Sequence, residues 1–430
     1  MSRLAALLLA ALTLLAMVDA SLLTAASPAD EILLAARLDP DALHHGAALI
    51  LFGPIDGWSW LSSARAAMAG CGAVTLLGLI AAGRRVSASL LGATLLAATG
   101  MMSPPLVQAF AAGHLAGPAL ACAALAAAFG WRSPTAFEAL LSGLASAAAA
   151  QIDPVFWAAA AAVPAACLVA GKPSKAVLAA FVPLVVLAVW VADGVPSLPM
   201  IDAPDLATVT HALFGFGGLG LSIATLGTGL LRLGRGGGGV PPEAAGALIL
   251  VIAGMLLGTP ALSVLGLVWL AAALAGIVVA GQSPLPVLVV QAGGVITGAP
   301  LLLGLLINAP MLARPESWPG ALATQQAGRL DKLIPSQERL IATLAPSQVI
   351  DAAPVIPALV WLAGTPAQIA RDMNDLLAKT SPSAVVVAEV SKALRPNNEI
   401  LRAWAVSHGY RPLPADGPLQ TIFTRERPVQ

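Results

Sequence analysis

The chain has 430 residues, of which 58% are hydrophobic and only 10% are charged. Ordinary soluble domains carry about 25% charged residues, and so few charges could not cover the surface of a soluble protein of this length. The 22 basic and 22 acidic side chains cancel, which argues against a nucleic-acid partner. The composition therefore predicts an α-helical membrane protein, whose main partner is the lipid bilayer.

Apolar runs of about 16 to 26 residues recur over the first 310 residues, each long enough to cross about 30 Å of hydrocarbon as a helix. They predict eleven transmembrane helices, near 4–24, 66–83, 87–103, 106–130, 136–151, 155–171, 176–193, 206–231, 244–259, 261–281 and 285–308. The 87–103 and 136–151 runs are short enough to be tilted or partly re-entrant. No repeat recurs with a period of 20–50 residues, so an inverted-repeat transporter has no support.

The charges between the runs predict the orientation in the membrane. Alternate turns carry the cations Arg3, Arg84, Arg85, Arg132, Lys172, Lys175, Arg232 and Arg235. The other turns carry mainly acidic residues. Lys and Arg on short loops stay in the cytoplasm, so we expect a cytoplasmic N-terminus and, after eleven spans, an extracytoplasmic C-terminal region. The first run could instead be a cleaved signal peptide, with Val18-Asp19-Ala20 as a poor cleavage site.

The first outer loop, residues 25–65, is rich in charge compared with its surroundings. Apolar residues at helical spacing after Ser27 predict an amphipathic helix in the membrane interface. Ser27 is a good N-cap, and Asp30 and Glu31 fall in the first turn, where the helix dipole favours anions. Helix capping is therefore the simplest interpretation of the acidic pair.

The composition changes abruptly at residue 310, where polar and charged residues return. Strand-like runs appear at 349–351, 358–362, 384–390 and 420–424, and helix-like runs at 366–377 and 398–408, the second ending at Gly409. Strands that alternate with helices predict a small α/β domain over 310–430, following a transmembrane domain over 1–309. We expect no catalytic constellation in this domain.

Residues 28–70 resemble the beginning of the GT-C superfamily, the polyprenyl-phosphate-sugar-dependent glycosyltransferases that include protein mannosyltransferases and aminoarabinose transferases. In that family the first outer loop opens with an Asp-Glu pair and an interfacial helix, here Asp30-Glu31-Ile32-Leu33-Leu34-Ala35-Ala36-Arg37. A His- or Lys-Pro-Pro segment, a Gly and an Arg that opens the second span follow. The counterparts here are His45-Gly46-Ala47-Ala48, Gly53 and Arg65.

The resemblance implies an inverting transfer of a hexosyl or pentosyl group from a polyprenyl-phosphate donor. The acceptor would be a lipid, a glycan or a protein on the extracytoplasmic side of a bacterial inner membrane. It implies Asp30 as the general base with Glu31 as its neighbour, because one carboxylate must deprotonate the acceptor hydroxyl. The residues implied for substrate and phosphate contacts are Arg37, His44, His45, Arg65 and His114. No metal ligand is implied, and the need for a divalent cation stays open.

Two departures from the family keep alternatives open. Gly46-Ala47 replaces the Pro-Pro pair, and the second outer loop, 108–114, offers His114 where the family usually has a carboxylate. A non-catalytic GT-C-like membrane protein is therefore one alternative, and a transporter of a lipid or glycan is another. Ion-coupled transport is disfavoured because the predicted spans hold so few ionisable groups. For Arg65 the alternative is an interfacial anchor whose guanidinium snorkels to the headgroups.

Overall fold

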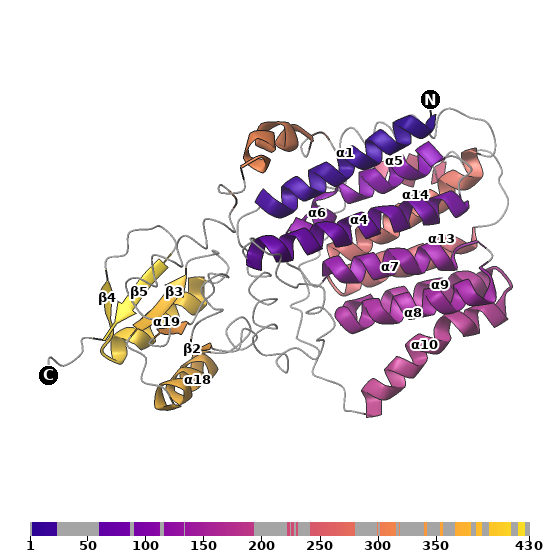
Figure 1. Ribbon diagram of the computed structural model, residues 1–430. Coiled ribbons are helices and arrows are strands. Elements are labelled where there is room, and N and C mark those ends of the chain that lie inside the picture. Colours follow the sequence, from indigo (N-terminus) through magenta and orange to yellow (C-terminus); the bar gives the residue numbers. More distant parts are fainter. Residues whose placement is uncertain are drawn as a thin grey trace. The chain divides into compact units, whose positions relative to one another are not determined.

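The structure is a computed structural model of the whole chain (Figure 1). It describes residues 2–23, 60–86, 90–111, 116–132, 134–192, 222–223, 225–227, 229–230, 241–279, 299, 302–314, 318, 339–341, 353–355, 366–379, 384–388, 395–413 and 420–425. The chain divides into two compact units. The first comprises Met1–Ser21, Met68–Ala111 and Leu115–Ala309, and the second comprises Leu22–Ala67, Ala112–His114 and Pro310–Gln430.

The described part of residues 1–312 is a bundle of apolar helices (Figure 1). They are α1 (Ser2–Leu23), α4 (Trp60–Val86), α5 (Leu90–Met101), α6 (Pro104–Ala111), α7 (Ala116–Gly130), α8 (Ala136–Ile152), α9 (Trp157–Val169), α10 (Pro173–Ala192), α13 (Pro242–Leu256) and α14 (Pro260–Val279), with a short 3₁₀ turn, η2 (Pro154–Phe156), before α9. A further apolar helix covers Leu302–Leu312. Among the described residues, Arg3–Leu23 and Ser62–Val86 are each long and apolar enough to cross a membrane, and α5 with α6 would make a third span.

Most predicted spans within the described residues have a helix in the expected place, but 87–130 is divided differently. The sequence predicted one helix over 87–103 and another over 106–130. The structure instead has α5 and α6 as a pair bent by 70°, with α7 as a separate helix. Pro104 and Pro105 explain the bend, since proline lacks the N–H that would continue the helical hydrogen bonds of α5. The predicted spans 206–231 and 285–308 lie mostly outside the described residues.

Small residues allow the helices of the bundle to approach closely. Its core is dominated by buried alanines, and α13 packs on both α9 and α14 while α8 packs on α7 and α10. A Cβ added at Gly143 in α8 would lie 2.5 Å from the carbonyl oxygen of Ala179 in α10, and one at Gly246 in α13 would overlap the carbonyl oxygen of Ala162 in α9. Membrane helices associate through such close packing, because lipid tails are as apolar as the side chains.

An aromatic pair also packs in the core of the described bundle. Trp131, just after α7, meets Trp269 of α14 edge to face, with 4.9 Å between ring centroids. Both side chains are 1% exposed. Met17 of α1 belongs to the same core cluster, so α1 packs against the other helices of the bundle.

The tail contains a five-stranded sheet in the order β2-β1-β3-β5-β4. The strands are β1 (Arg339–Ile341), β2 (Ala353–Val355), β3 (Ala384–Ala388), β4 (Arg411–Leu413) and β5 (Gln420–Thr424). β1 pairs in parallel with β2 and β3, while β5 pairs antiparallel with β3 and β4. The amphipathic helices α18 (Pro366–Lys379) and α19 (Arg395–Ser407) pack on each other.

The elements of the tail agree with the sequence prediction where the local signal was strong. Predicted helices at 366–377 and 398–408 correspond to α18 and α19, and predicted strands at 384–390 and 420–424 correspond to β3 and β5. The second helix ends as expected, since Gly409 has φ +82° and the N–H of Tyr410 bonds back to the carbonyl of Ala405 at 3.0 Å. The predicted strands at 349–351 and 358–362 lie outside the described residues.

Candidate active site

The structure describes one of the seven residues that the sequence predicted for the active site. Asp30, Glu31, Arg37, His44, His45 and His114 lie outside the described residues and stay predictions. Arg65 is described, in the second turn of α4, and only 2% of it is exposed. Its neighbours Ser62 and Ser63 are buried as well.

The burial of Arg65 differs from that of an interfacial anchor. An anchoring arginine keeps its guanidinium in water or among headgroups while its stem covers apolar surface. A guanidinium removed from water instead needs hydrogen-bonding or charged partners, because burying an uncompensated charge is very costly. Arg65 is therefore a cation enclosed by the protein and not one displayed at its surface.

The position of Arg65 along α4 relates it to the membrane. Arg84 and Arg85 stand in the last turn of the same helix. Arg65 and Arg85 are 20 residues apart, which at 1.5 Å per residue is about 30 Å, the thickness of the hydrocarbon core. The helix α4 thus carries the buried Arg65 near one membrane surface and the less buried Arg84 and Arg85 near the other.

A second buried polar group lies near the end of α1. Asp19 is 5% exposed, and one of its carboxylate oxygens accepts a 3.4 Å hydrogen bond from the side-chain amide of Asn308. The other oxygen, Oδ1, has no hydrogen-bond partner among the described residues. Asp19 lies 16 residues beyond Arg3, about 24 Å along the helix. It is therefore far from the cationic beginning of α1.

Ser21 fixes the same end of α1. Its hydroxyl, fully buried, donates to the carbonyl oxygen of Phe110, the penultimate residue of α6, at 3.0 Å. The last turns of α1 are thereby connected to the end of the bent pair and to the helix Leu302–Leu312. The sequence did contain a signal for this region, because a carboxylate inside an apolar span marks a functional or structural site by default.

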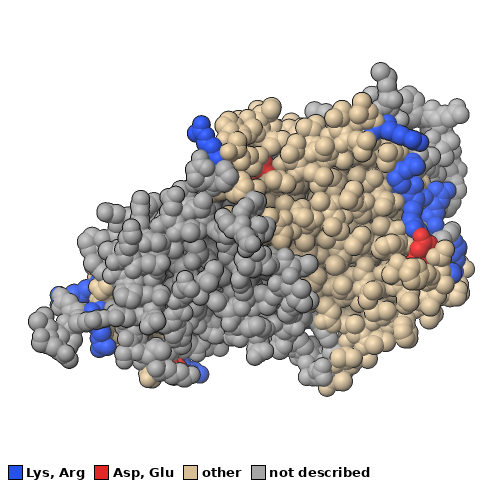
Figure 2. Space-filling view, in the orientation of Figure 1, with Lys and Arg blue, Asp and Glu red and all other residues tan. Residues whose placement is uncertain are grey.

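The other end of the bundle holds an ion-paired network. The Arg85 guanidinium pairs with the Glu138 carboxylate and donates to the carbonyl oxygens of Phe129 and Trp131, both at 3.2 Å. Arg132 donates to the carbonyl oxygen of Arg85 at 2.8 Å. This network connects the last turns of α4 and α7 to the first turn of α8. Figure 2 shows Lys and Arg side chains gathered at this end, with the middle of the visible bundle face almost free of charge.

Glu138 has a second role in this network. Thr135 is the N-cap of α8, its hydroxyl accepts from the N–H of Glu138 at 3.2 Å, and the Glu138 carboxylate accepts from the N–H of Thr135 at 2.8 Å. This reciprocal capping box satisfies N–H groups that the helix leaves unpaired. The charges here therefore have a structural explanation. Within the described residues, no three His, Cys, Asp or Glu side chains converge as a metal site would require.

No protein-family profile and no curated protein sequence matches the chain. Solved structures do match. ArnT from Cupriavidus metallidurans, an aminoarabinose transferase, matches in its apo state with a TM-score of 0.62 and 13% identity over 97% of both chains. ArnT bound to undecaprenyl phosphate matches with a TM-score of 0.59 and 12% identity, again over 97% of both chains.

An Archaeoglobus fulgidus oligosaccharyltransferase in complex with Zn and sulfate gives a TM-score of 0.43 at 11% identity, over 96% of this chain and 72% of that one. The fold assignment rests on the two ArnT structures. The resemblance predicted from residues 28–70 is confirmed at the level of the fold. Over nearly its whole length, the chain has the fold of the two ArnT structures.

Proposed function

We propose that the protein is a membrane glycosyltransferase that moves a sugar from a polyprenyl-phosphate donor to a lipid, glycan or protein acceptor. The observation that carries this proposal is the fold shared over 97% of the chain with ArnT, one of whose structures is bound to undecaprenyl phosphate. A buried arginine near one membrane surface and an Asp-Glu pair in the preceding loop support it. Such residue types suit a reaction in which a lipid phosphate departs.

The proposed site is on the extracytoplasmic side of a bacterial inner membrane. The cation-rich end of the bundle is then cytoplasmic, because Lys and Arg on short loops are retained there. The beginning of α4, about 30 Å away along the helix, is at the outer surface. The first outer loop and the C-terminal domain are periplasmic in this orientation.

The chemistry assigned to the site is an inverting displacement at the anomeric carbon. The acceptor oxygen forms a bond to that carbon while the bond to the lipid phosphate oxygen breaks, and the phosphate leaves with the electron pair. Asp30, with Glu31 beside it, takes the proton of the acceptor hydroxyl. Arg65 stabilises the charge that develops on the departing phosphate. Arg37, His44, His45 and His114 complete the contacts to donor and acceptor, and a divalent cation could share the phosphate.

Donor binding is tested through Arg65, using α4 as its own control. The full chain in detergent is titrated with undecaprenyl phosphate and binding is followed by native mass spectrometry. Hydrogen bonds to charged groups contribute about 1.5–3 kcal/mol, so Arg65→Gln should weaken binding about ten- to a hundredfold. Arg84→Gln, at the other end of the same helix, should leave it unchanged.

Arg65→Lys separates a binding defect from a folding defect because it keeps the charge. It should retain part of the affinity, and the melting temperatures of all variants are recorded alongside. Equal affinity in Arg65→Gln and wild type would remove Arg65 from the phosphate site. Equal loss in Arg84→Gln would show that charge at either membrane surface, not a site, governs binding.

Catalysis is tested through Asp30→Asn. Asn retains the size and most of the capping ability of Asp, so the helix should survive at a cost of a few tenths of a kcal/mol. It cannot accept a proton, so transfer of sugar from polyprenyl-phosphate donors should fall about 10²–10⁴-fold. Near wild-type activity would move the role to Glu31. If Glu31→Gln were also silent, the non-catalytic alternative, which the absence of a carboxylate in the segment 108–114 favours, would replace the transferase.

A further inference from the structure

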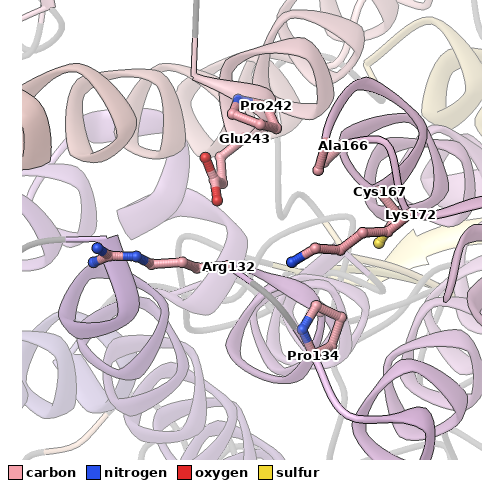
Figure 3. Close-up of a pocket in the computed structure, with 9 residues that line it drawn as sticks. Arg132, Pro134, Ala166, Cys167, Lys172, Pro242 and Glu243 are labelled. Atoms are coloured by element: carbon pink, nitrogen blue, oxygen red, sulfur yellow. The ribbon is translucent and has the colours of Figure 1, made fainter.

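Buried carboxylates at the two ends of the bundle have different surroundings. At the cation-rich end, the Glu243 carboxylate is directed into a small hollow that Lys172 enters from another side, with Arg132 at its edge (Figure 3). Cations therefore lie beside this carboxylate. At the opposite end, Asp19 has among the described residues only the 3.4 Å hydrogen bond from Asn308, and its Oδ1 has no partner there. Asp19 is thus the less well compensated of the two.

The pair of Asp19 and Asn308 is a poor device for stability alone. A carboxylate that leaves water loses its hydration, and a single hydrogen bond replaces only part of that loss. Buried ionic groups can often be replaced by apolar side chains of similar size without any loss of stability. An ionisable side chain retained inside a membrane span therefore indicates a functional role, which its hydrogen-bond partner shares.

The same pair lies where the chain passes from one compact unit to the other. The first unit is left after Ser21, two residues beyond Asp19, and for the last time after Ala309, one residue beyond Asn308. The hydrogen bond from Ser21 ends on the carbonyl oxygen of Phe110, one residue before the first unit is left again. Hydrogen bonds thus join the places at which the chain leaves the membrane bundle.

The helix Leu302–Leu312 depends on this hydrogen bond more than an uninterrupted, well-packed helix would. Pro310 has no N–H to donate to the carbonyl oxygen of Leu306, so the helical hydrogen bonding is interrupted two residues after Asn308. The helix also turns much of its apolar surface away from the bundle, with exposed fractions of 60% for Leu303, 74% for Leu306 and 67% for Ile307. The bond to Asp19 therefore holds the helix just before its weakest point.

We propose that Asp19 and Asn308 are positioning residues of the transferase, an inference that rests on the proposed function. Their hydrogen bond fixes the ends of the first and last membrane helices relative to each other. The loop with Asp30 follows the first of these helices, 11 residues after Asp19, and the tail follows the last. A shift between the two helices therefore moves the proposed general base, although neither positioning residue touches substrate.

The activity test compares variants that break the hydrogen bond with variants that keep it. In Asp19→Leu and Asn308→Leu, kcat for sugar transfer should fall about ten- to a hundredfold with KM for the donor nearly unchanged, because a misplacement of about 1 Å can cost a hundredfold in rate. Asp19→Asn can still bond to Asn308 and should retain most of kcat. Thr13→Val is the control, since Thr13 is buried on the same helix but bonds only within it, to the carbonyl oxygen of Leu9.

An exchanged pair tests whether the two residues act on each other. Asn308→Asp places two carboxylates together and should lose activity at least as far as Asn308→Leu. Adding Asp19→Asn restores one carboxylate and one amide in exchanged positions, and it should rescue kcat. Rescue cannot arise if each side chain acts independently. Failure of the rescue, with every variant folded, would contradict the proposed pairing.

The docking of the last helix is measured without any assay of activity. Spin labels are attached at Leu15→Cys on the first helix and Leu306→Cys on the last, which are exposed positions, after Cys71, Cys122 and Cys167 are replaced by alanine. The distance distribution by electron-electron resonance should broaden in Asp19→Leu and stay as in wild type in Asp19→Asn. The melting temperature of Asp19→Leu should stay the same or rise.

The outcomes separate this inference from the proposed function. An unchanged distance distribution in Asp19→Leu would overturn the inference, and if activity were lost as well, Asp19 would take part in the reaction directly. A lower melting temperature with kcat unchanged would make the pair structural only. A broadened distribution in Asp19→Leu, with no sugar transfer even by the wild type, would support the connection between the helices and refute the proposed function instead.

Discussion

The membrane bundle and the tail are each stabilised by a different kind of internal packing. In the bundle, helices approach until backbone meets backbone, and the core is largely alanine, with glycines such as Gly143 and Gly246 at the closest contacts. In the tail, the described core is built on large side chains, among them Trp404, Tyr410 and Phe423. Lipid provides no hydrophobic force between helices, whereas water provides a strong one for an exposed sheet and its helices. The stability of the bundle should therefore fall most when a side chain is enlarged, and the stability of the tail when a buried side chain is truncated.

Trp404→Ala should give the largest effect on stability. The Trp404 ring stacks on His408 at 4.3 Å between ring centroids, and its indole N–H donates to Asn374 at 2.9 Å, joining α19 to α18. Truncating a buried tryptophan costs about 3–5 kcal/mol. Hydrogen exchange should therefore accelerate in peptides from 366–379 and 395–424 and stay unchanged in α7 and α14.

Val406→Ala is the control for this substitution, because Val406 lies on the same helix and is 58% exposed. It should leave exchange unchanged throughout. If Trp404→Ala also accelerated exchange in α7 and α14, the two regions would be one cooperative unit and the comparison between them would fail.

Gly143→Ala should have the next largest effect. Its new Cβ would lie 2.5 Å from the Ala179 carbonyl oxygen, a backbone atom that cannot move aside on its own. Separating α8 from α10 to admit the methyl group should cost about 1–3 kcal/mol, seen as a lower melting temperature in detergent.

The same change at Gly70, where nothing lies within 4 Å of a Cβ, is the control. Gly70→Ala should be neutral or stabilise α4 by up to about 1 kcal/mol, because alanine is the better helix former. Equal effects at the two glycines would mean that close backbone packing does not hold the bundle together.

Glu138→Gln should have a smaller effect. Gln retains the capping box with Thr135, so the substitution removes mainly the ion pair with Arg85, whose side chain is 29% exposed against 27% for Glu138. A pair at this exposure contributes less than about 1 kcal/mol, and the loss should shrink as salt is added. Thr135→Ala removes the cap and should cost more, about 0.5–2 kcal/mol. A larger loss for Glu138→Gln than for Thr135→Ala would make the ion pair, not the cap, the main anchor of α8.

The smallest and most local of the expected effects is a shift in the pKa of Tyr410. Burial raises the pKa of its phenol, an effect that Arg425, 5.9 Å from the ring, partly offsets. It is the only tyrosine in the chain, so absorbance near 295 nm should titrate with one midpoint above 10 in the folded protein and near 10 in denaturant. Because the unfolded state releases this proton first, the tail should lose stability as pH rises above about 10. A folded midpoint at or below 10 would mean that water reaches the aromatic core.

The sequence predicted helices and spans well where charges bracket an apolar run. Arg84 and Arg85 lie at the end of α4, and Lys172 lies between α9 and α10, so the charged residues mark the same boundaries as the hydropathy. Between 106 and 130 no charge interrupts the run, and the separation of α6 from α7 was missed. The three-residue strand β4, with Pro412 at its centre, was also missed, because it forms through pairing with β5 rather than through its own propensity.

The residue types of the candidate site could be predicted from the sequence, but their burial and their partners could not. An arginine that opens a span has the same local sequence whether it faces headgroups or is enclosed, so the burial of Arg65 could not be inferred. The partner of Asp19 is Asn308, 289 residues later in the chain. No local pattern predicts such a pairing, since it depends on how the last membrane helix returns to the first.

The 70° bend between α5 and α6 has a consequence for how the protein is made. α5 has 12 residues, about 18 Å, and so cannot cross a bilayer of about 30 Å by itself. In the finished bundle it packs against α14, with Gly100 closely facing Val268, a residue synthesised long afterwards. A nascent chain that inserts helix by helix therefore has to keep this segment shielded until its partner emerges from the ribosome. Truncation before residue 260 should leave α5 without that partner and expose the chain to membrane quality control.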